Sequence, residues 1–232
     1  MEKKRLAKFM AAAGVASRRA CEEFIFSGRV RVNGVVTLLP QTLVDENDQI
    51  MLDSHSLKGA EGKVYYILNK PAGYLCSPVD SRRQKLVLDL FDKVNKRLFT
   101  VGRLDKDTTG LLIVTNDGAF AHQVMHPLSN IRKEYIVKVS QEVSSDHLKA
   151  INEGTEVDGG FVKPISVTKV RRGTVKIVVA EGRKREVRLL VEAAGLEVKE
   201  LKRVKIGGLR LGTLPVGTWR EMTEREKTVI FH

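Results

Sequence analysis

The apolar positions at the start of the chain repeat first with the period of a helix and then with that of a strand. One helical face is formed by residues spaced i, i+3, i+4 and i+7, namely Leu6, Phe9, Met10 and Ala13. Gly14 is a typical helix stop, and Ser17 is a typical N-cap that predicts a second helix reaching Gly28. Alternation over residues 29–32, followed by Asn33-Gly34 and two valines, predicts a β-hairpin.

Strand and helix patterns are mixed over the rest of the chain. Strands are predicted at residues 49–52, 63–68, 98–101, 111–114, 133–139 and 174–180. Short helices are predicted at residues 86–91, 119–125 and 184–194. The polar, glycine-containing stretch of residues 53–62 has no clear period and indicates a linker region. We therefore expect an α+β protein with domains at residues 1–55 and 63–232, joined by a linker at residues 56–62.

A polar loop leads into the apolar run of residues 111–114. It places Asp105 between Arg103 and Lys106, whose positive charges favour an ionised carboxylate that can act as a nucleophile or a base. The simpler interpretation is that Asp105 and Asp107 are turn residues whose side chains bond to their own backbone. The loop alone does not decide between these two interpretations.

The chain carries a large positive charge. Its 232 residues include 40 Lys and Arg against 28 Asp and Glu, a net charge of +12, which favours a polyanionic partner such as nucleic acid. An anionic membrane is the competing partner, but no apolar run approaches the roughly 20 residues of a membrane span. The basic N-terminal segment resembles a signal peptide, yet Lys8 interrupts it, so a cytoplasmic protein without membrane contact is expected.

The basic residues are concentrated in two segments. Residues 2–31 contain eight basic and three acidic residues, and the candidates for phosphate contact are Lys8, Arg18, Arg19, Arg29 and Arg31. Residues 163–210 contain 14 basic and five acidic residues. There the start of the helix predicted at residues 184–194 forms an anion site, reinforced by Arg183, Lys184 and Arg185. A merely solvated charged face is the alternative for each of these residues.

No metal site is predicted. Cys21 and Cys76 are far apart and lack the companion spacing of a zinc site or a disulfide framework. His122 and His126 have the i, i+4 spacing of metal ligands on one helix face. Without a third ligand nearby, structural or RNA-contact roles are preferred for both.

Several motifs resemble known RNA-modifying proteins. Residues 12–19 and 28–34 resemble the S4 RNA-binding module. Arg103-Leu104-Asp105, followed by Thr109-Gly110-Leu111-Leu112, resembles the catalytic loop of the ribosomal-RNA pseudouridine synthases of the RsuA and RluB group. Further matches to that family are the Lys-Pro-x-Gly turn at residues 70–73, the Lys-x-Tyr start of a strand at residues 133–135, and residues 181–188. The last segment departs from the family pattern at Glu186, where Gln is common.

The resemblance implies a catalytic domain with a mixed, mostly antiparallel sheet flanked by helices. It also implies that Asp105 is the nucleophile or base, that Tyr135 stacks on the uracil, and that Arg188 forms an ion pair with Asp105. Arg103 would help extrude the base. Lys70 would support the turn first and contact RNA second.

We therefore predict an enzyme that isomerises a uridine of ribosomal RNA to pseudouridine, more in keeping with the large subunit than the small. The reaction needs no cofactor and no metal, and a monomer is the default expectation. One rival is a non-catalytic RNA-binding or assembly protein. Another is a glycoside-cleaving enzyme that uses Asp105 and Asp107 as a carboxylate pair, although residues two apart in a loop have no assured geometry for this.

Overall fold

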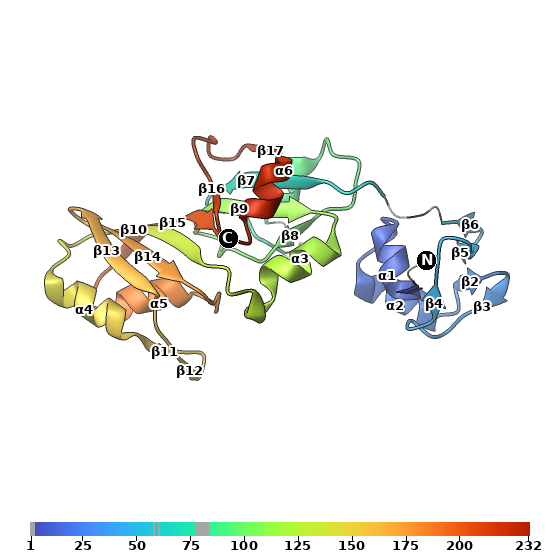
Figure 1. The fold of residues 1–232 in the computed structure, drawn as a ribbon, viewed down its shortest axis with the longest axis horizontal. Helices are drawn as coiled ribbons and strands as arrows, with labels where there is room; N and C mark the ends of the chain where they lie inside the picture. Colours follow the sequence, from blue (N-terminus) through green and yellow to red (C-terminus); the bar gives the residue numbers. More distant parts are fainter. Residues whose placement is uncertain (1–2, 58, 60, 78–83) are drawn as a thin grey trace. The chain divides into compact units, whose positions relative to one another are not determined.

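The chain folds into two compact units. The computed structural model describes residues 3–57, 59, 61–77 and 84–232. The first unit comprises Met1–Val64, Val94–Leu98 and Asn116–Gly118, and the second comprises Tyr65–Lys93, Phe99–Thr115 and Ala119–His232 (Figure 1). The predicted domain boundaries do not coincide with this division residue for residue and stay a prediction.

The first unit contains the predicted helix pair and hairpin. The helices are α1 (Leu6–Ala12) and α2 (Arg18–Phe26). The strands are β1 (Lys4–Arg5), β2 (Val30–Val32), β3 (Val35–Val36), β4 (Leu43–Val44), β5 (Ile50–Leu52) and β6 (His55–Ser56). Four of them form an antiparallel sheet in the order β3-β2-β5-β6, and β1 pairs with β4. The predicted linker at residues 56–62 thus begins inside a strand.

Local signals account for the boundaries of these elements. The Ser17 hydroxyl accepts a hydrogen bond from the Ala20 backbone N–H at 3.1 Å and caps α2. Asn33 and Gly34 have φ values of 52° and 82°, the left-handed conformation that a two-residue hairpin turn requires. The apolar faces of α1 and α2 meet in a core that includes Met10, Cys21 and Ile25.

The second unit is built on one large sheet. Its strands are β7 (Tyr65–Lys70), β8 (Phe99–Val101), β9 (Thr109–Thr115), β10 (Lys133–Val139), β13 (Ser166–Arg171), β14 (Thr174–Val179), β15 (Val198–Ile206), β16 (Leu209–Arg210) and β17 (Trp219–Glu221). The order is β13-β14-β10-β15-β9-β7-β17, with β16 beside β15 and β8 beside β9. Only the β9–β15 pair is parallel among the described strands of this sheet. The predicted mixed, mostly antiparallel sheet is confirmed.

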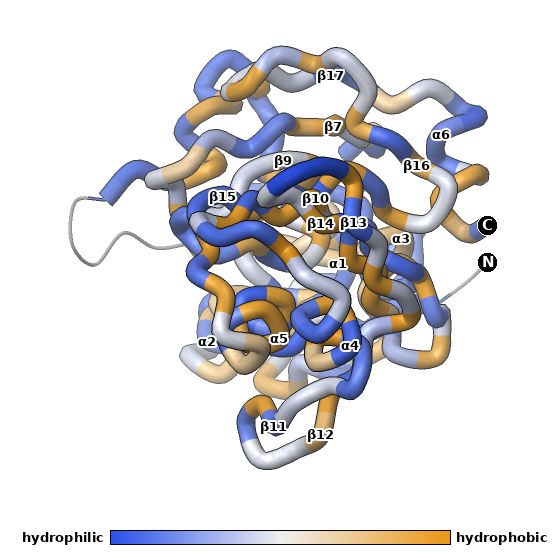
Figure 2. Tube along the Cα trace, turned by 90° about the vertical axis from the view of Figure 1, so that its left-hand side faces the viewer, coloured by the Kyte–Doolittle hydropathy of each residue, from blue (hydrophilic) through white to orange (hydrophobic). Residues whose placement is uncertain are grey.

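Helices and a small hairpin flank this sheet. The helices are α3 (Gly118–Met125), α4 (Ser145–Glu153), α5 (Glu186–Ala193) and α6 (Glu224–Val229), with 3-10 turns η1 (Val87–Phe91) and η2 (Pro127–Ser129). The hairpin is formed by β11 (Thr155–Val157) and β12 (Gly160–Val162). Helices α4 and α5 pack together against β13 and β15 (Figure 1), and both show hydrophobic and hydrophilic positions side by side (Figure 2).

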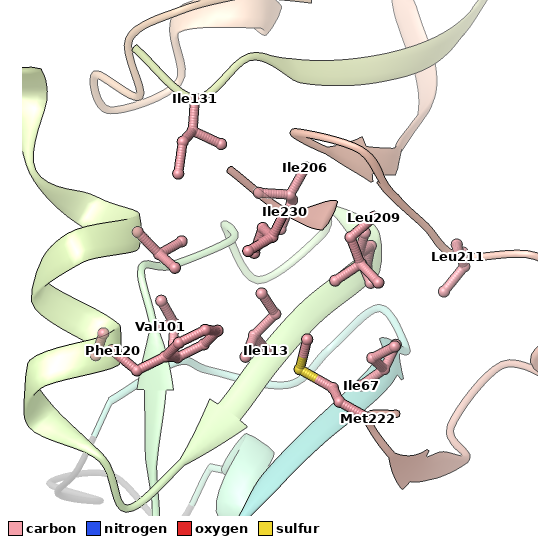
Figure 3. Packing of buried hydrophobic residues seen from close by; sticks show 13 residues of the cluster. Ile67, Val101, Ile113, Phe120, Ile131, Ile206, Leu209, Leu211, Met222 and Ile230 are labelled. Atoms are coloured by element: carbon pink, nitrogen blue, oxygen red, sulfur yellow. The ribbon is translucent and has the colours of Figure 1, made fainter. Parts of the chain in front are cut away.

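The core of the second unit lies where α3 covers β7, β8 and β9. Phe120 of α3 packs against Val101 and Ile113, and Ile67 and Met222 complete the cluster around them (Figure 3). Nearly every residue of β7 and β9 is buried, as expected for central strands covered on both faces. This explains why the sequence of β9 reads as a continuous apolar run rather than an alternating one.

Trp219 closes the edge of the sheet. Its indole ring stacks on Phe91 with ring centroids 5.0 Å apart and an interplanar angle of 20°, and it meets Tyr66 edge-on. The indole N–H donates to the Leu90 carbonyl at 2.8 Å. Trp219 is therefore a packing residue.

Glu226 anchors α6 through its charge, which gives the first testable prediction. Hydrogen bonds from Arg220 at 2.6 and 2.8 Å are the main cause that lowers the pKa of this carboxyl from 4.5 to about 2. A lowered folded-state pKa contributes stability above pH 4.5 that is lost as the pH falls towards 2. We expect Glu226→Gln to lower the free energy of unfolding by about 1 kcal/mol at pH 7.

Chemical denaturation at pH 7 and near pH 2.5 measures this effect. The Glu226→Gln deficit should shrink at the lower pH, because the native carboxyl is then partly protonated. Glu224→Gln is the matched control, since Glu224 is 90% exposed and its ion pair with Lys227 contributes little. An equal deficit at both pH values would contradict the ionic origin of the stabilisation.

Candidate active site

The loop that carries Asp105 connects β8 to β9. Leu104 is buried and its backbone N–H donates to the Cys76 sulfur at 3.4 Å, while the Thr108 N–H donates to the Asp105 carbonyl at 3.1 Å. Asp105 itself is half-buried, between the exposed side chains of Arg103 and Lys106. The loop is therefore held by backbone contacts near both ends and places Asp105 shortly before β9, with Asp107 exposed two residues further on.

Lys70, the last residue of β7, binds the same loop through its side chain. Its side chain is 0% exposed, and its ammonium group lies 2.9–3.1 Å from the carbonyl oxygens of Pro71, Asp105, Lys106 and Thr108. Burial lowers the pKa of Lys70, while Cys76 and the carboxylates of Asp107 and Asp105 raise it. The prediction that Lys70 contacts RNA is therefore wrong, because its ammonium group is enclosed by backbone carbonyls; the structural role is supported.

Tyr135 lies on β10, which β15 separates from the strand that follows this loop. The predicted alternation is confirmed, since Tyr135, Val137 and Val139 are the buried residues of the strand. Lys133 precedes it and donates to the carbonyls of Ala180 and Glu181 at 3.2 and 3.1 Å. This pair of bonds ties the start of β10 to the segment that leads into α5.

The predicted ion pair between Arg188 and Asp105 is not found. No ion pair in the described part of the chain joins any cation to the Asp105 carboxylate within 4.0 Å. Arg188 lies in the first turn of α5 and is half-buried. The Asp105 loop is instead linked to Lys70, whose ammonium group donates to the Asp105 carbonyl at 3.1 Å and to the Thr108 carbonyl at 2.9 Å.

The start of α5 also differs from the prediction. The helix begins at Glu186, two residues later than expected, because Arg185 takes the left-handed conformation with φ of 56°. The Glu186 carboxylate is buried and accepts a hydrogen bond from the Arg183 backbone N–H at 3.1 Å. Burial raises the pKa of Glu186, and the bond from Arg183 opposes that rise. The Glu186 carboxylate thus bonds to the segment that precedes α5. Lys184 and Arg185 remain exposed, and the anion site at the helix start stays a prediction.

Arg203 on β15 is a buried cation that the sequence analysis did not select. Its side chain is 3% exposed, and Nε donates to the Leu111 carbonyl at 2.8 Å. In the strand register Arg203 lies opposite Gly110 on one side and Tyr135 on the other. The signal was the alternation along β15, in which Leu201 and Arg203 are buried and Lys202 and Val204 are half-buried, so that Arg203 lies on the more buried face.

Comparison with known proteins agrees with this arrangement. The family model described as RNA pseudouridylate synthase matches residues 64–193, which include the Asp105 loop, Lys70, Tyr135 and Arg188. The chain belongs to the RNA pseudouridine synthase family. A second model, the S4 domain, matches residues 4–50.

Relatives and a solved structure extend the family match over almost the whole chain. A putative ribosomal large subunit pseudouridine synthase, chloroplastic, of Arabidopsis thaliana is 47% identical over 96% of this chain, which spans 59% of that relative's length. The ribosomal large subunit pseudouridine synthase B of Bacillus subtilis is 39% identical, over 96% of this chain and 93% of its own. A crystal structure of a pseudouridylate synthase has a TM-score of 0.71 at 30% identity, covering 97% of this chain and 99% of its own.

The S4 domain of this pseudouridine synthase exposes all the basic residues predicted to meet phosphate, namely Lys8, Arg18, Arg19, Arg29 and Arg31. Three of them are partly engaged, and Arg31 donates to the Gly34 carbonyl at 3.1 Å. Arg29 forms a bidentate pair with Asp53 at 3.0 and 2.7 Å, and Arg18 lies 3.2 Å from Glu22. Lys8 and Arg19 are in no ion pair among the described residues, so they are the freest cations for a partner.

The described residues show neither a membrane-spanning helix nor a cluster of metal ligands. Within the described ranges, no helix of this pseudouridine synthase is both long and apolar enough to cross a membrane. Nor do the described His, Cys, Asp and Glu residues form any cluster of three or more suited to a metal ion. His122 and His126 lie with ring centroids 5.0 Å apart in an open depression shared with Phe231.

Proposed function

We propose that this pseudouridine synthase isomerises a uridine of large-subunit ribosomal RNA, with the S4 domain holding the RNA by its phosphates. The observation that carries the proposal is the Asp105 loop, whose backbone carbonyls are bound by the buried Lys70, on a sheet that also carries the buried Tyr135. The choice of the large subunit is supported by the names of the relatives from Arabidopsis and Bacillus. The predicted cytoplasmic location and monomeric state are part of the same proposal.

The chemistry requires access to the sugar and a pocket for a detached base. The C1′–N1 bond breaks with its electron pair on N1, the base turns, and C5 joins C1′ with loss of the C5 proton. Asp105 acts either as the nucleophile at C1′ or as the base that starts cleavage. Tyr135 stacks on the uracil, and the exposed Arg103 helps to extrude the nucleotide from its stack.

Incubation of the purified chain with ribosomal RNA tritiated at C5 tests the reaction. Because C5 gives up its hydrogen when it joins C1′, release of tritium reports isomerisation. We expect tritium to be released from the large-subunit RNA of the source organism in an amount equivalent to one uridine in that RNA. Release from the small-subunit RNA alone would assign the modified uridine to the small subunit. Release from neither RNA would contradict the proposal for free ribosomal RNA.

The RNA-holding role of the S4 domain gives a second prediction. The double variant Lys8→Gln/Arg19→Gln should weaken RNA binding about tenfold and reduce the slope of log affinity against log salt by about 2, because two phosphate contacts are lost. Filter binding at several salt concentrations measures both quantities. The single-turnover rate at saturating enzyme should not change.

The matched control is Lys93→Gln/Arg225→Gln, which removes the same charge from exposed residues elsewhere. If the control weakened RNA binding as much as the S4 variant did, the loss of affinity would be caused by the change in total charge. That result would contradict a specific role for the S4 surface.

A further inference from the structure

The guanidinium of Arg203 has an unused hydrogen-bond donor in the interior of the second unit. Nε is satisfied by the Leu111 carbonyl, but Nη2 is buried without a partner among the described residues. A buried cation is costly unless its donors are matched, and buried guanidinium groups in purely structural roles normally have acceptors. The free donor therefore points to an acceptor supplied from outside the chain.

The strand register directs Arg203 to the candidate active site. It lies directly opposite Tyr135, and residues opposite one another on neighbouring strands project from the same face. Val204 is an extra residue in β15 at this point, since Glu134 pairs with Lys205 and Tyr135 with Arg203. Such bulges change the direction of a side chain and are frequent beside active sites.

Gly110 brings Arg203 close to the Asp105 loop. A Cβ on Gly110 would lie 2.2 Å from the Arg203 carbonyl oxygen, so only glycine allows β9 and β15 to approach this closely. Gly110 is the second residue of β9, and the Asp105 loop ends directly before that strand. Arg203 thus sits between the end of the loop and Tyr135.

The surroundings of Arg203 are positively charged. Burial raises the pKa of the Cys76 thiol, and the charges of Lys70, Arg203 and Arg103 oppose that rise. Burial lowers the pKa of Lys133, and the charge of Arg203 lowers it further. Lys70, Arg103 and Arg203 therefore lie around Cys76, an arrangement that favours a bound anion there. Near Lys133 the carboxylates of Glu186 and Glu181 offset part of the charge of Arg203.

We propose that Arg203 is a further catalytic residue, whose free Nη2 donates to a carbonyl oxygen of the detached uracil. This inference rests on the proposed function. When the C1′–N1 bond breaks, its electron pair stays on N1, and the negative charge is shared with the carbonyl oxygens of the base. A preorganised donor and positive charge in a water-poor site stabilise this anion and the transition state that leads to it. The anion is consumed when C5 bonds to C1′ and the C5 proton leaves.

Arg203→Met and Arg203→Lys test the proposal. The single-turnover rate on uridine RNA should fall about a hundredfold for Arg203→Met and about tenfold for Arg203→Lys, which keeps the charge but not the planar donor. The RNA dissociation constant should stay within about threefold of the native value, because the residue is reached only by the extruded base. Arg210→Met, at an exposed position on β16, is the control.

A change of leaving group separates this role from a structural one. In RNA with 5-fluorouridine at the target, fluorine stabilises the uracil anion, and consumption of the nucleotide reports bond cleavage. The rate loss caused by either Arg203 variant should be several times smaller on this RNA than on uridine RNA. If Arg203→Met does not fold, the rates of Arg203→Lys on the two RNAs provide the same comparison.

Unchanged rates, or an equal loss on both RNAs, would overturn the role of Arg203 while leaving the proposed function intact. A native chain that consumes neither RNA would overturn the proposed function, and this inference with it.

Discussion

Replacement of Asp105 by asparagine will abolish pseudouridine formation without weakening RNA binding. Asparagine has nearly the same shape as aspartate but cannot act as a carboxylate nucleophile or base, so the chemical step loses its central group. The loop is held by the backbone N–H groups of Leu104 and Thr108 and by the side-chain ammonium group of Lys70, so the substitution should leave its conformation unchanged. We expect a rate loss of at least about a thousandfold in single-turnover assays, with an unchanged dissociation constant.

Asp107→Asn is the matched control for this prediction. Asp107 is exposed two residues further along the same loop. The variant should retain most of the activity, because only one carboxylate is needed by the proposed reaction. Loss of turnover in Asp107→Asn as severe as in Asp105→Asn would instead favour a carboxylate pair of the glycosidase type.

Replacement of Lys70 by methionine will cost both stability and activity. The change removes the donors that the carbonyls of Pro71, Asp105, Lys106 and Thr108 share. A buried acceptor left unsatisfied costs about 1–3 kcal/mol, so a loss of about 3 kcal/mol in the free energy of unfolding is expected after relaxation of the loop. Denaturant unfolding and single-turnover kinetics, measured below the unfolding transition, report the two effects.

Lys106→Met provides the comparison, since Lys106 is an exposed lysine of the same loop whose ammonium lies 3.3 Å from the Gln84 side chain. It should change stability by less than about 0.5 kcal/mol. A Lys70→Met variant as stable and active as Lys106→Met would show that the carbonyl contacts do not position the Asp105 loop.

The elements of the fold were predictable wherever local chemistry specifies them. Ser17 as an N-cap, the Asn33-Gly34 turn and the alternation around Tyr135 each determine a short segment without help from the rest of the chain. Strands β1, β4 and β6 were missed because each has two residues, too few to show a period. Their pairing depends on tertiary contacts.

The loop of the candidate site could be predicted from the sequence, but the contacts that support the loop could not. Motifs located Asp105 and Tyr135, but burial decides what a cation does, and burial is a property of the assembled sheet. RNA contact was therefore given to Lys70 as a second role, after support of the turn, although its ammonium group is enclosed by carbonyls. Arg203 was overlooked because its function depends on its pairing with Gly110 and Tyr135, which are distant in sequence.

Pseudouridine mapping of both ribosomal RNAs tests the central claim most directly. The cells would lack this protein and carry either the native chain or Asp105→Asn. We predict that one site in the large-subunit RNA is lost, that the native chain restores it, and that Asp105→Asn does not. Unchanged sites in both RNAs, or restoration by Asp105→Asn, would contradict the account.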